Sequence, residues 1–291
     1  MMSEPIIAIT GATRGLGQLA AISLAKQGAH LILTARSERA AEITRDILSQ
    51  HAPNAKVDFF FGDLSLMDQV RQVGDEIRSA YPKIDVLVNN AGLHGFEQRI
   101  TKDGYPEMVA VNYLAPWLLT HLLLPSLKNA EQARIINVAS EASRHHGELK
   151  LPQDLTDTAE FSRWGSSKIY GKTKLLNIMF TGEMSRRLDG TSITVNALNP
   201  GFNVTGLGRE LAFSSVLEKA LRFLKIGDPR RGAGIIVQLV TDSRYRGVTG
   251  GYFNVGSGKA ITPVHPGGDS NTQRLLWNAT ESLLKPYLKK L

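Results

Sequence analysis

Tyr170 and Lys174 stand four residues apart in a stretch of sequence with helical character. Residues at this spacing lie one turn apart on the same face of a helix. A free tyrosine has a pKa of about 10, and a neighbouring ammonium group lowers that pKa because it favours the phenolate. The pair therefore predicts a tyrosine that exchanges protons near neutral pH. The alternative is an ordinary tyrosine on the surface of an amphipathic helix.

A second chemical signal is the glycine-rich stretch at residues 10–17, directly after an apolar run. The first glycine would allow a tight turn, the second would let the backbone approach a phosphate, and the third would let a helix pack on its strand. Backbone N–H groups at the start of that helix would point at the anion. The spacing G-x-x-x-G-x-G predicts a site for a nucleotide pyrophosphate, with a flexible turn as the alternative. The expected contacts are Gly11, Thr13, Arg14, Gly15, Leu16 and Gly17.

Basic residues stand where the ribose of that nucleotide would lie. A site for NAD places an acidic residue about 20 positions beyond the glycines, on the ribose 2′-hydroxyl. Here that position is Arg36, and Arg14 lies inside the glycine turn. Two guanidinium groups would bind a 2′-phosphate through charge-assisted hydrogen bonds, so the sequence predicts NADP(H). Glu38 is the rival acidic candidate, but we expect it to start a helix; the alternative for Arg36 is a surface charge.

Strand and helix patterns alternate along the chain and must position these residues. The strand patterns are continuous apolar runs, as in a parallel sheet covered by helices on both faces. We therefore predict an α/β fold, a Rossmann-like doubly wound parallel sheet of about seven strands in a single domain. The expected strands cover residues 6–10, 30–35, 57–61, 84–88, 133–138, 193–199 and 252–255. The expected helices cover residues 16–27, 38–50, 66–80, 108–127, 167–188 and 232–241, and a helical tail covers about 269–291. The helix at 108–127 is expected to be disturbed at Pro116.

Polar or turn-forming residues follow most of these strands. In such a sheet the ligand binds beyond the carboxyl ends of the strands, so these residues should line one cleft. Each alone is also consistent with an ordinary loop, and Asp63 with an acid that caps a turn. The residues expected in the cleft are Arg36, Ser37, Asp63, Leu64, Asn90, Ala91, Gly92, Ser140, Pro200 and Gly201.

These motifs, in this order, resemble those of the short-chain dehydrogenase/reductase family over roughly residues 5–255. The resemblance rests on residues 10–17, residues 89–92, Asn112, Ser140 and residues 170–174. A closer resemblance, to the retinol-dehydrogenase-like branch, rests on residues 111–114, 136–140, 174–177 and 275–277. Many members of that branch carry an N-terminal membrane anchor, and no such segment is expected here.

The resemblance implies an oxidoreductase that transfers a hydride between a nicotinamide and a carbonyl or alcohol carbon. It implies that Tyr170 is the general acid/base and that Lys174 also holds the nicotinamide ribose. Ser140 would hydrogen-bond the substrate oxygen, and Asn112 would help hold a water that relays protons to Lys174. Thr205 would contact the nicotinamide carboxamide. The alternative is a non-catalytic nucleotide-sensing or scaffold protein on the same fold.

Two segments are expected to frame the substrate pocket. One is the connection 143–165, which contains Trp164, and the other is a lid at about 203–228. Apolar residues at 202–217 predict a lipophilic carbonyl or alcohol substrate, although such residues could equally pack on the core or on a subunit. The amphipathic tail could cover the pocket rim or form an interface, so a homo-oligomer remains open. In the family, the position of Asp63 contacts the adenine.

Composition excludes several other classes of protein. The 291 residues contain no cysteine, which excludes disulfides, a thiolate nucleophile and a Cys-based zinc site. The net charge of +7 is scattered, without a basic block or an aromatic platform, so no nucleic-acid partner is expected. We expect no metal, no signal peptide and no integral membrane segment, and hence a cytoplasmic protein.

Overall fold

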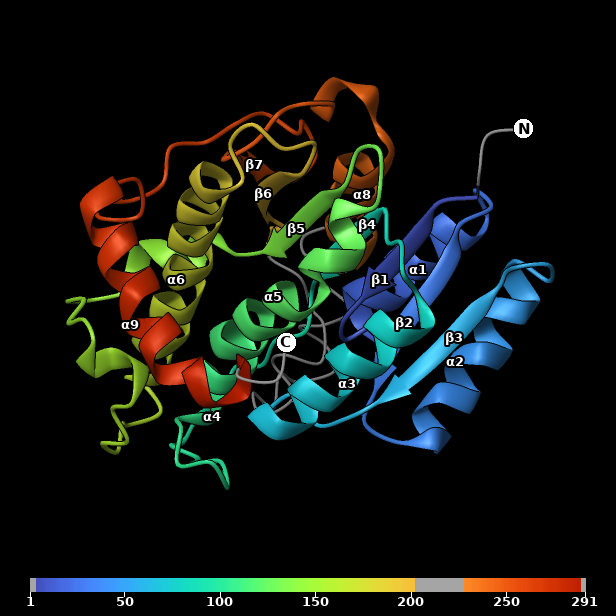
Figure 1. The fold of residues 1–291 in the computed structure, drawn as a ribbon. Coiled ribbons are helices and arrows are strands. Elements are labelled where there is room, and N and C mark those ends of the chain that lie inside the picture. Colours follow the sequence, from blue (N-terminus) through green and yellow to red (C-terminus); the bar gives the residue numbers. More distant parts are fainter. Residues whose placement is uncertain (1–3, 202–227, 289–291) are drawn as a thin grey trace.

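Seven parallel strands form one sheet in the computed structural model, which describes residues 4–201 and 228–288 (Figure 1). The strand order is β3-β2-β1-β4-β5-β6-β7, so the order reverses between the neighbours β1 and β4. This reversal is the point at which doubly wound sheets bind ligands. The strands are β1 (Ile6–Ile9), β2 (His30–Ala35), β3 (Val57–Phe61), β4 (Val86–Asn89), β5 (Arg134–Val138), β6 (Thr194–Asn199) and β7 (Tyr252–Asn254).

Helices cover both faces of the sheet, and each face has its own apolar core. One core joins the sheet to α1, α2 and α8, and the other joins it to α3, α5, α6 and α9. The central strands are buried on both sides, which explains their unbroken apolar sequences. The long helices are α1 (Gly15–Ala25), α2 (Glu38–His51), α3 (Met67–Ala80), α5 (Ala115–Lys128), α6 (Ser166–Arg187), α8 (Pro229–Thr241) and α9 (Ser270–Leu288).

The disturbance expected in the helix at 108–127 is a π-helical turn that ends just before Pro116. The helix divides into a short α4 (Glu107–Val109), a π-helical turn, η1 (Ala110–Leu114), and α5. Pro116 lies in the first turn of α5, where its missing N–H is tolerated. Because proline has no N–H to bond the carbonyl four residues earlier, a regular α-helix cannot run from α4 through this position. Such π-turns occur often at functional sites, and this one carries Asn112.

The same region is long and apolar enough to cross a membrane by length and composition alone. However, 83% of the most apolar window of Glu107–Lys128 is buried inside the protein. The buried side chains of α5 include Trp117, Leu118 and Leu122. This burial is typical of a core helix.

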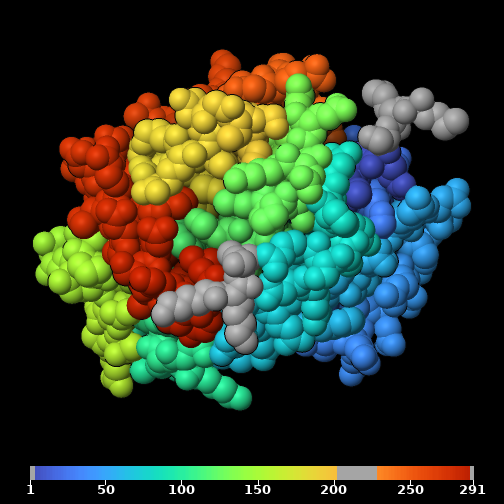
Figure 2. All heavy atoms as spheres, in the orientation of Figure 1, coloured from blue at the N-terminus to red at the C-terminus, as the bar shows by residue number. Residues whose placement is uncertain are grey.

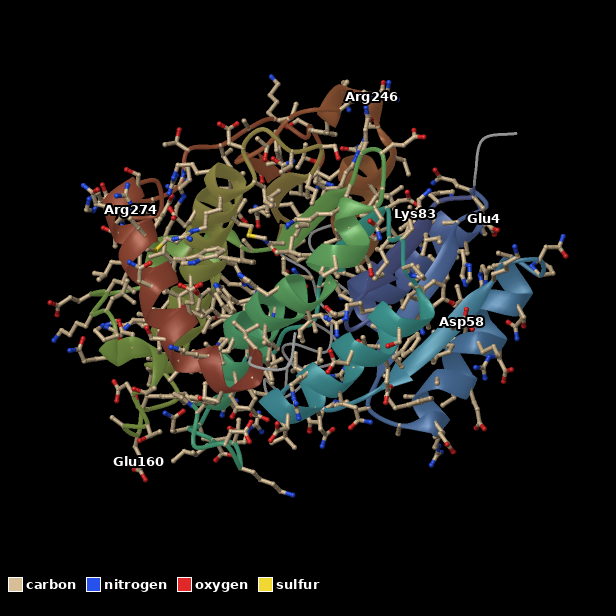
Figure 3. The ribbon with its side chains drawn as sticks, viewed as in Figure 1. Glu4, Asp58, Lys83, Glu160, Arg246 and Arg274 are labelled. Atoms are coloured by element: carbon tan, nitrogen blue, oxygen red, sulfur yellow. The ribbon has the colours of Figure 1, made fainter. Side chains whose placement is uncertain are left out.

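The C-terminal tail is a helix that packs on the protein. Leu276, Trp277 and Leu284 are buried, and α9 contacts α6, α5 and α3. Figure 2 shows α9 as a red band on the surface beside the yellow of α6. Its apolar face therefore belongs to the core of the described chain. Charged side chains of both signs, such as Asp58, Lys83 and Arg246, are spread around the outside of the fold (Figure 3).

Candidate active site

The turn after β1 is built from glycines that no other residue could replace without strain or overlap. Gly11 and Gly15 have φ values of +66° and +59°, in the left-handed region. A Cβ at Gly11 would lie 2.8 Å from the Cα of Ala91. A Cβ at Gly17 would overlap the carbonyl oxygen of Gly11 and the side chain of Asn90. The backbone therefore forms an open cradle at the start of α1, which fits a bound pyrophosphate.

Asn90 joins this turn to the loop after β4. Its Nδ2 donates hydrogen bonds to the carbonyl oxygens of Thr10, at 2.8 Å, and Gly11, at 3.1 Å. The backbone N–H groups of Asn90 and Ala91 both donate to Oγ1 of Thr10, at 3.0 Å. These bonds cross the reversal point between β1 and β4. They hold two of the expected cofactor segments against each other.

Arg36 and Ser37 are exposed directly after β2, at the same edge of the sheet. The hydroxyl of Ser37 caps α2 by accepting a hydrogen bond from the N–H of Ala40, at 3.3 Å. Glu38 is the first residue of α2, as expected. Arg36 is therefore the charged side chain that directly follows β2, as the sequence predicts. Arg14 is exposed at the N-cap position of α1.

Asp63 acts in the local turn after β3. Its Oδ1 accepts a hydrogen bond from the N–H of Ser65, at 2.9 Å, and the adjacent Gly62 donates to the carbonyl of Ala35, at 3.0 Å. The structure thus shows the turn role of Asp63, and it places this turn beside the end of β2. The next residue, Leu64, is buried in the core.

Asn112 is fully buried in the π-turn, and its side-chain amide makes three hydrogen bonds to two residues. Oδ1 accepts from the N–H of Leu93, at 2.8 Å, while Nδ2 donates to the carbonyl of Leu93, at 2.8 Å, and to Oγ1 of Thr173, at 3.0 Å. A Cβ at Gly92 would lie 3.4 Å both from Oδ1 of Asn112 and from Nζ of Lys174. The structure therefore brings the loop after β4, the π-turn and α6 together at one point.

Lys174 and Tyr170 share one face of α6, as their spacing predicts. Nζ of Lys174 lies 5.6 Å from the centre of the Tyr170 ring and donates a hydrogen bond to the carbonyl of Val138, at 2.9 Å. Lys174 is 3% exposed, and burial lowers its pKa to about 8. Burial also raises the pKa of the Tyr170 phenol.

The expected lowering of the Tyr170 pKa is therefore wrong for the protein alone. Burial of the phenol is the cause of the raised pKa, and the Lys174 ammonium is itself buried and donates to the carbonyl of Val138. The geometry of the pair is confirmed. A lowered pKa of Tyr170 would require further positive charge or hydrogen-bond donors at the phenol oxygen.

Ser140 lies two residues after β5 and caps a short 3-10 helix, η2 (Glu141–His145). Its Oγ accepts a hydrogen bond from the N–H of Ala142, at 3.1 Å, which leaves the hydroxyl hydrogen available as a donor. A Cβ at Gly171 would overlap the carbonyl oxygen of Ala142. Because Gly171 follows Tyr170 directly, this close contact places the serine turn beside the tyrosine.

The remaining expected residues lie after β6. Gly201 has a φ of +76° and donates its N–H to Oδ1 of Asn199, at 3.1 Å. The same Oδ1 accepts from the N–H of Glu141, at 3.2 Å, so the end of β6 is tied to η2. Thr205 and the expected lid up to residue 227 lie outside the described residues.

Trp164, in the connection 143–165 that is expected to frame the pocket, is 92% exposed.

Some support residues of this site lie in the predicted motifs without an assigned role, and one lies outside them. Gly171 gave a signal, since a glycine inside a helix suggests close packing. Asn177 lies in the 174–177 motif, and its buried Nδ2 donates to the backbone carbonyl of Asn112, at 2.9 Å. His94, stacked on the Tyr170 ring, gave no signal because only the folded loop brings it there.

The fold and this site define a dinucleotide-binding protein of the doubly wound class. The family model described as short chain dehydrogenase matches residues 5–151. Mouse "Retinol dehydrogenase 14" is 33% identical, with 98% of this chain and 87% of that protein aligned. "Short-chain dehydrogenase TIC 32 B, chloroplastic" of Brassica napus is 30% identical, over 95% of this chain and 87% of its own.

Solved structures agree with these sequence relatives. A crystal structure of a protein from Mycobacterium paratuberculosis superposes with a TM-score of 0.76 at 25% identity, covering 97% of this chain and 94% of the other. The chain belongs to the short-chain dehydrogenase family and resembles its retinol-dehydrogenase-like branch. It is therefore an oxidoreductase of that family, which binds a nicotinamide cofactor.

Proposed function

We propose that the protein is an NADP(H)-dependent oxidoreductase that interconverts a lipophilic carbonyl compound and its alcohol. The observation that carries this proposal is the convergence of Tyr170, Lys174 and Asn112 at the carboxyl edge of the sheet, beside the glycine cradle. A non-catalytic sensor on the same fold would have no need to hold a buried lysine and a tyrosine together at this position.

The bound nicotinamide would supply or accept the hydride. Tyr170 would donate the proton to the developing alkoxide in reduction and remove it in oxidation. The Ser140 hydroxyl would hydrogen-bond the same substrate oxygen and hold it near the phenol. Lys174 would offer its remaining donors to the cofactor ribose, since one donor is already used by Val138.

A second role of the lysine is electrostatic. The positive charge of Lys174, whose Nζ lies 5.6 Å from the centre of the Tyr170 ring, would favour the phenolate over the phenol and so act against the burial that raises the pKa of Tyr170. Asn112 would help hold a water that relays protons to Lys174; both of its amide hydrogens are used, so this water would donate to the remaining lone pair of Oδ1.

The preference for NADP(H) rests on charge at the end of β2. Arg36 is exposed directly after the strand, the acidic rival Glu38 is committed to the first turn of α2, and Arg14 stands in the glycine turn. A 2′-phosphate would meet guanidinium groups there, whereas the 2′-hydroxyl of NAD would find no carboxylate acceptor at position 36.

The preference for a lipophilic substrate rests on the resemblance to retinol dehydrogenases and on the apolar residues of the 202–217 segment, which lie outside the described residues. A charged substrate would need a fixed counter-charge, because burying an unpaired ion costs on the order of several kcal/mol.

A comparison of carbonyl substrates with NADPH as reductant tests the proposal. Aromatic ketones and long-chain aldehydes should have catalytic efficiencies at least about tenfold above those of short keto acids and sugars. A preference for keto acids or sugars would remove the substrate class. The absence of NADPH oxidation with any carbonyl compound, together with measurable NADPH binding, would favour the non-catalytic alternative.

A further inference from the structure

We propose that His94 is a positioning residue for Tyr170, holding the phenol ring in the orientation that proton transfer requires. This inference rests on the proposed function, because it assigns a role relative to the catalytic tyrosine. His94 follows the cofactor loop 90–92 by two residues, and no motif of the chain includes it.

The backbone that carries His94 is held in place. Its neighbour Leu93 exchanges two hydrogen bonds with the side chain of Asn112, both at 2.8 Å. Asn112 is in turn bonded to Thr173 of α6. The histidine therefore projects from a segment whose position relative to α6 is already set.

The His94 ring lies flat on the Tyr170 ring. The ring centroids are 4.7 Å apart with an interplanar angle of 16°. His94 also lies against Phe96, with centroids 4.6 Å apart and an interplanar angle of 34°, and the guanidinium of Arg163 lies 5.3 Å from the centre of the Phe96 ring. Tyr170 is thus one layer of a stack, so rotation of its ring would break a contact on that face.

A hydrogen bond fixes the imidazole in this stack. Nε2 of His94 lies 3.1 Å from Oγ of Ser166, and that hydroxyl donates its hydrogen to the carbonyl of Arg163, at 2.7 Å. Because a hydroxyl has one hydrogen, Oγ must accept from His94, which places a hydrogen on Nε2. Ser166 is fully buried, so this bond is shielded from competing water.

The contacts bracket the tyrosine along α6. Ser166, Tyr170 and Thr173 occupy successive turns on one face of the helix. His94 is bonded to the first, stacked on the second, and linked through Leu93 and Asn112 to the third. The loop after β4 thereby orients the phenol, and a small misplacement of a catalytic group reduces turnover strongly.

Kinetics of three variants test this role. His94→Ala should lower kcat by about tenfold or more while the Kd for NADPH, measured by fluorescence, changes less than about twofold. His94→Phe keeps a flat ring without the hydrogen bond and should recover most of the lost kcat. Ser166→Ala should give a smaller loss that does not add to that of His94→Ala, because both act through one contact. His51→Ala, at an exposed histidine of α2, is the matched control.

Proton NMR of the imidazole provides a readout independent of activity. In the wild-type protein a ring proton of His94, assigned by its loss in His94→Phe, should be shifted upfield by the Tyr170 ring. That shift should decrease in Tyr170→Leu, and the contribution of the Phe96 ring should remain. Unchanged kcat in His94→Ala, or a loss of kcat that His94→Phe does not recover, would overturn the inference even if Tyr170→Phe is inactive. Full activity of Tyr170→Phe would instead remove the proposed function, while the NMR shift would still report the stack.

Discussion

A Cβ at residue 11 would lie 2.8 Å from the Cα of Ala91, so the glycine turn after β1 and the loop after β4 touch backbone to backbone. This contact crosses the reversal point of the sheet, where the nucleotide is expected. Real Cβ atoms do not approach a backbone carbon so closely, and the backbone cannot move aside without opening the cradle. The site therefore depends on Gly11 through both its φ of +66° and its missing side chain.

Replacing Gly11 by alanine should destabilise the protein and abolish tight NADPH binding. The left-handed conformation alone costs about 1–2 kcal/mol for a residue other than glycine, and the overlap with Ala91 adds about 1–3 kcal/mol. Gly28→Ala is the matched control, since Gly28 has a φ of +84° with nothing within 4 Å of a Cβ. Chemical unfolding should show a larger loss for Gly11→Ala. Equal losses for the two variants would contradict the close contact.

Replacing Arg36 by aspartate should exchange the cofactor preference. Loss of a charge-assisted hydrogen bond to the 2′-phosphate should weaken NADPH binding by about 1.5–3 kcal/mol, while NADH binding is kept or improved. Arg39→Asp makes the same change of charge at another exposed position of the α2 region and should have little effect on either cofactor. Titration of both variants with both cofactors is the measurement. Parallel weakening by the two substitutions would point to general electrostatics rather than to a phosphate site.

Replacing Lys174 by methionine should inactivate the enzyme and stabilise the fold at neutral pH. Burial holds the pKa of Lys174 at about 8, against 10.5 in the unfolded chain. Between these values the unfolded chain binds more protons, so the free energy of unfolding of the wild type rises with pH. Below pH 8 the buried charge costs up to about 3 kcal/mol. The stability advantage of Lys174→Met should therefore be largest near pH 7 and shrink from pH 8 to 10.5; an advantage that is independent of pH would contradict this.

Leu284→Ala should destabilise the protein far more than Leu275→Ala. Leu284 is 0% exposed and packs in the core beneath α9, whereas Leu275 is 51% exposed on the same helix. Truncation of a buried leucine lowers the free energy of unfolding by about 2–5 kcal/mol, whereas truncation of an exposed leucine lowers it by only about 0.5 kcal/mol or less. Thermal unfolding distinguishes the two. Similar small shifts would mean that α9 is not part of the core.

Most of the fold could be predicted because apolar runs and helix periodicity are local properties of the sequence. The bounds of β2 and β3 agree with the expected residues 30–35 and 57–61. Pro116 predicts a disturbance in the helix at 108–127, but the π-turn itself could not be predicted, since it shifts the hydrogen-bond ladder without changing the apolar composition. The expected tail is a helix, but its burial depends on the surfaces that α6 and α5 present.

The parts of the site that lie in sequence motifs could be predicted. The residues at the ends of β1, β4 and β5 and the Tyr170–Lys174 pair meet at one edge of the sheet because its strands are parallel. The direction in which the pKa of Tyr170 is shifted could not be predicted. The spacing of Tyr170 and Lys174 indicates a neighbouring charge, but it does not indicate the burial that raises this pKa. His94 and Ser166 were missed for a similar reason, since their contact joins residues 72 positions apart.

The most direct test of the central claim compares the wild type with Tyr170→Phe, using NADPH and an aromatic ketone or long-chain aldehyde. The variant lacks only the phenol oxygen, so NADPH binding and the unfolding midpoint should stay close to those of the wild type. Turnover should fall by at least about a hundredfold, because the general acid is lost. Turnover within about twofold of the wild type, with the fold intact, would contradict the proposed mechanism.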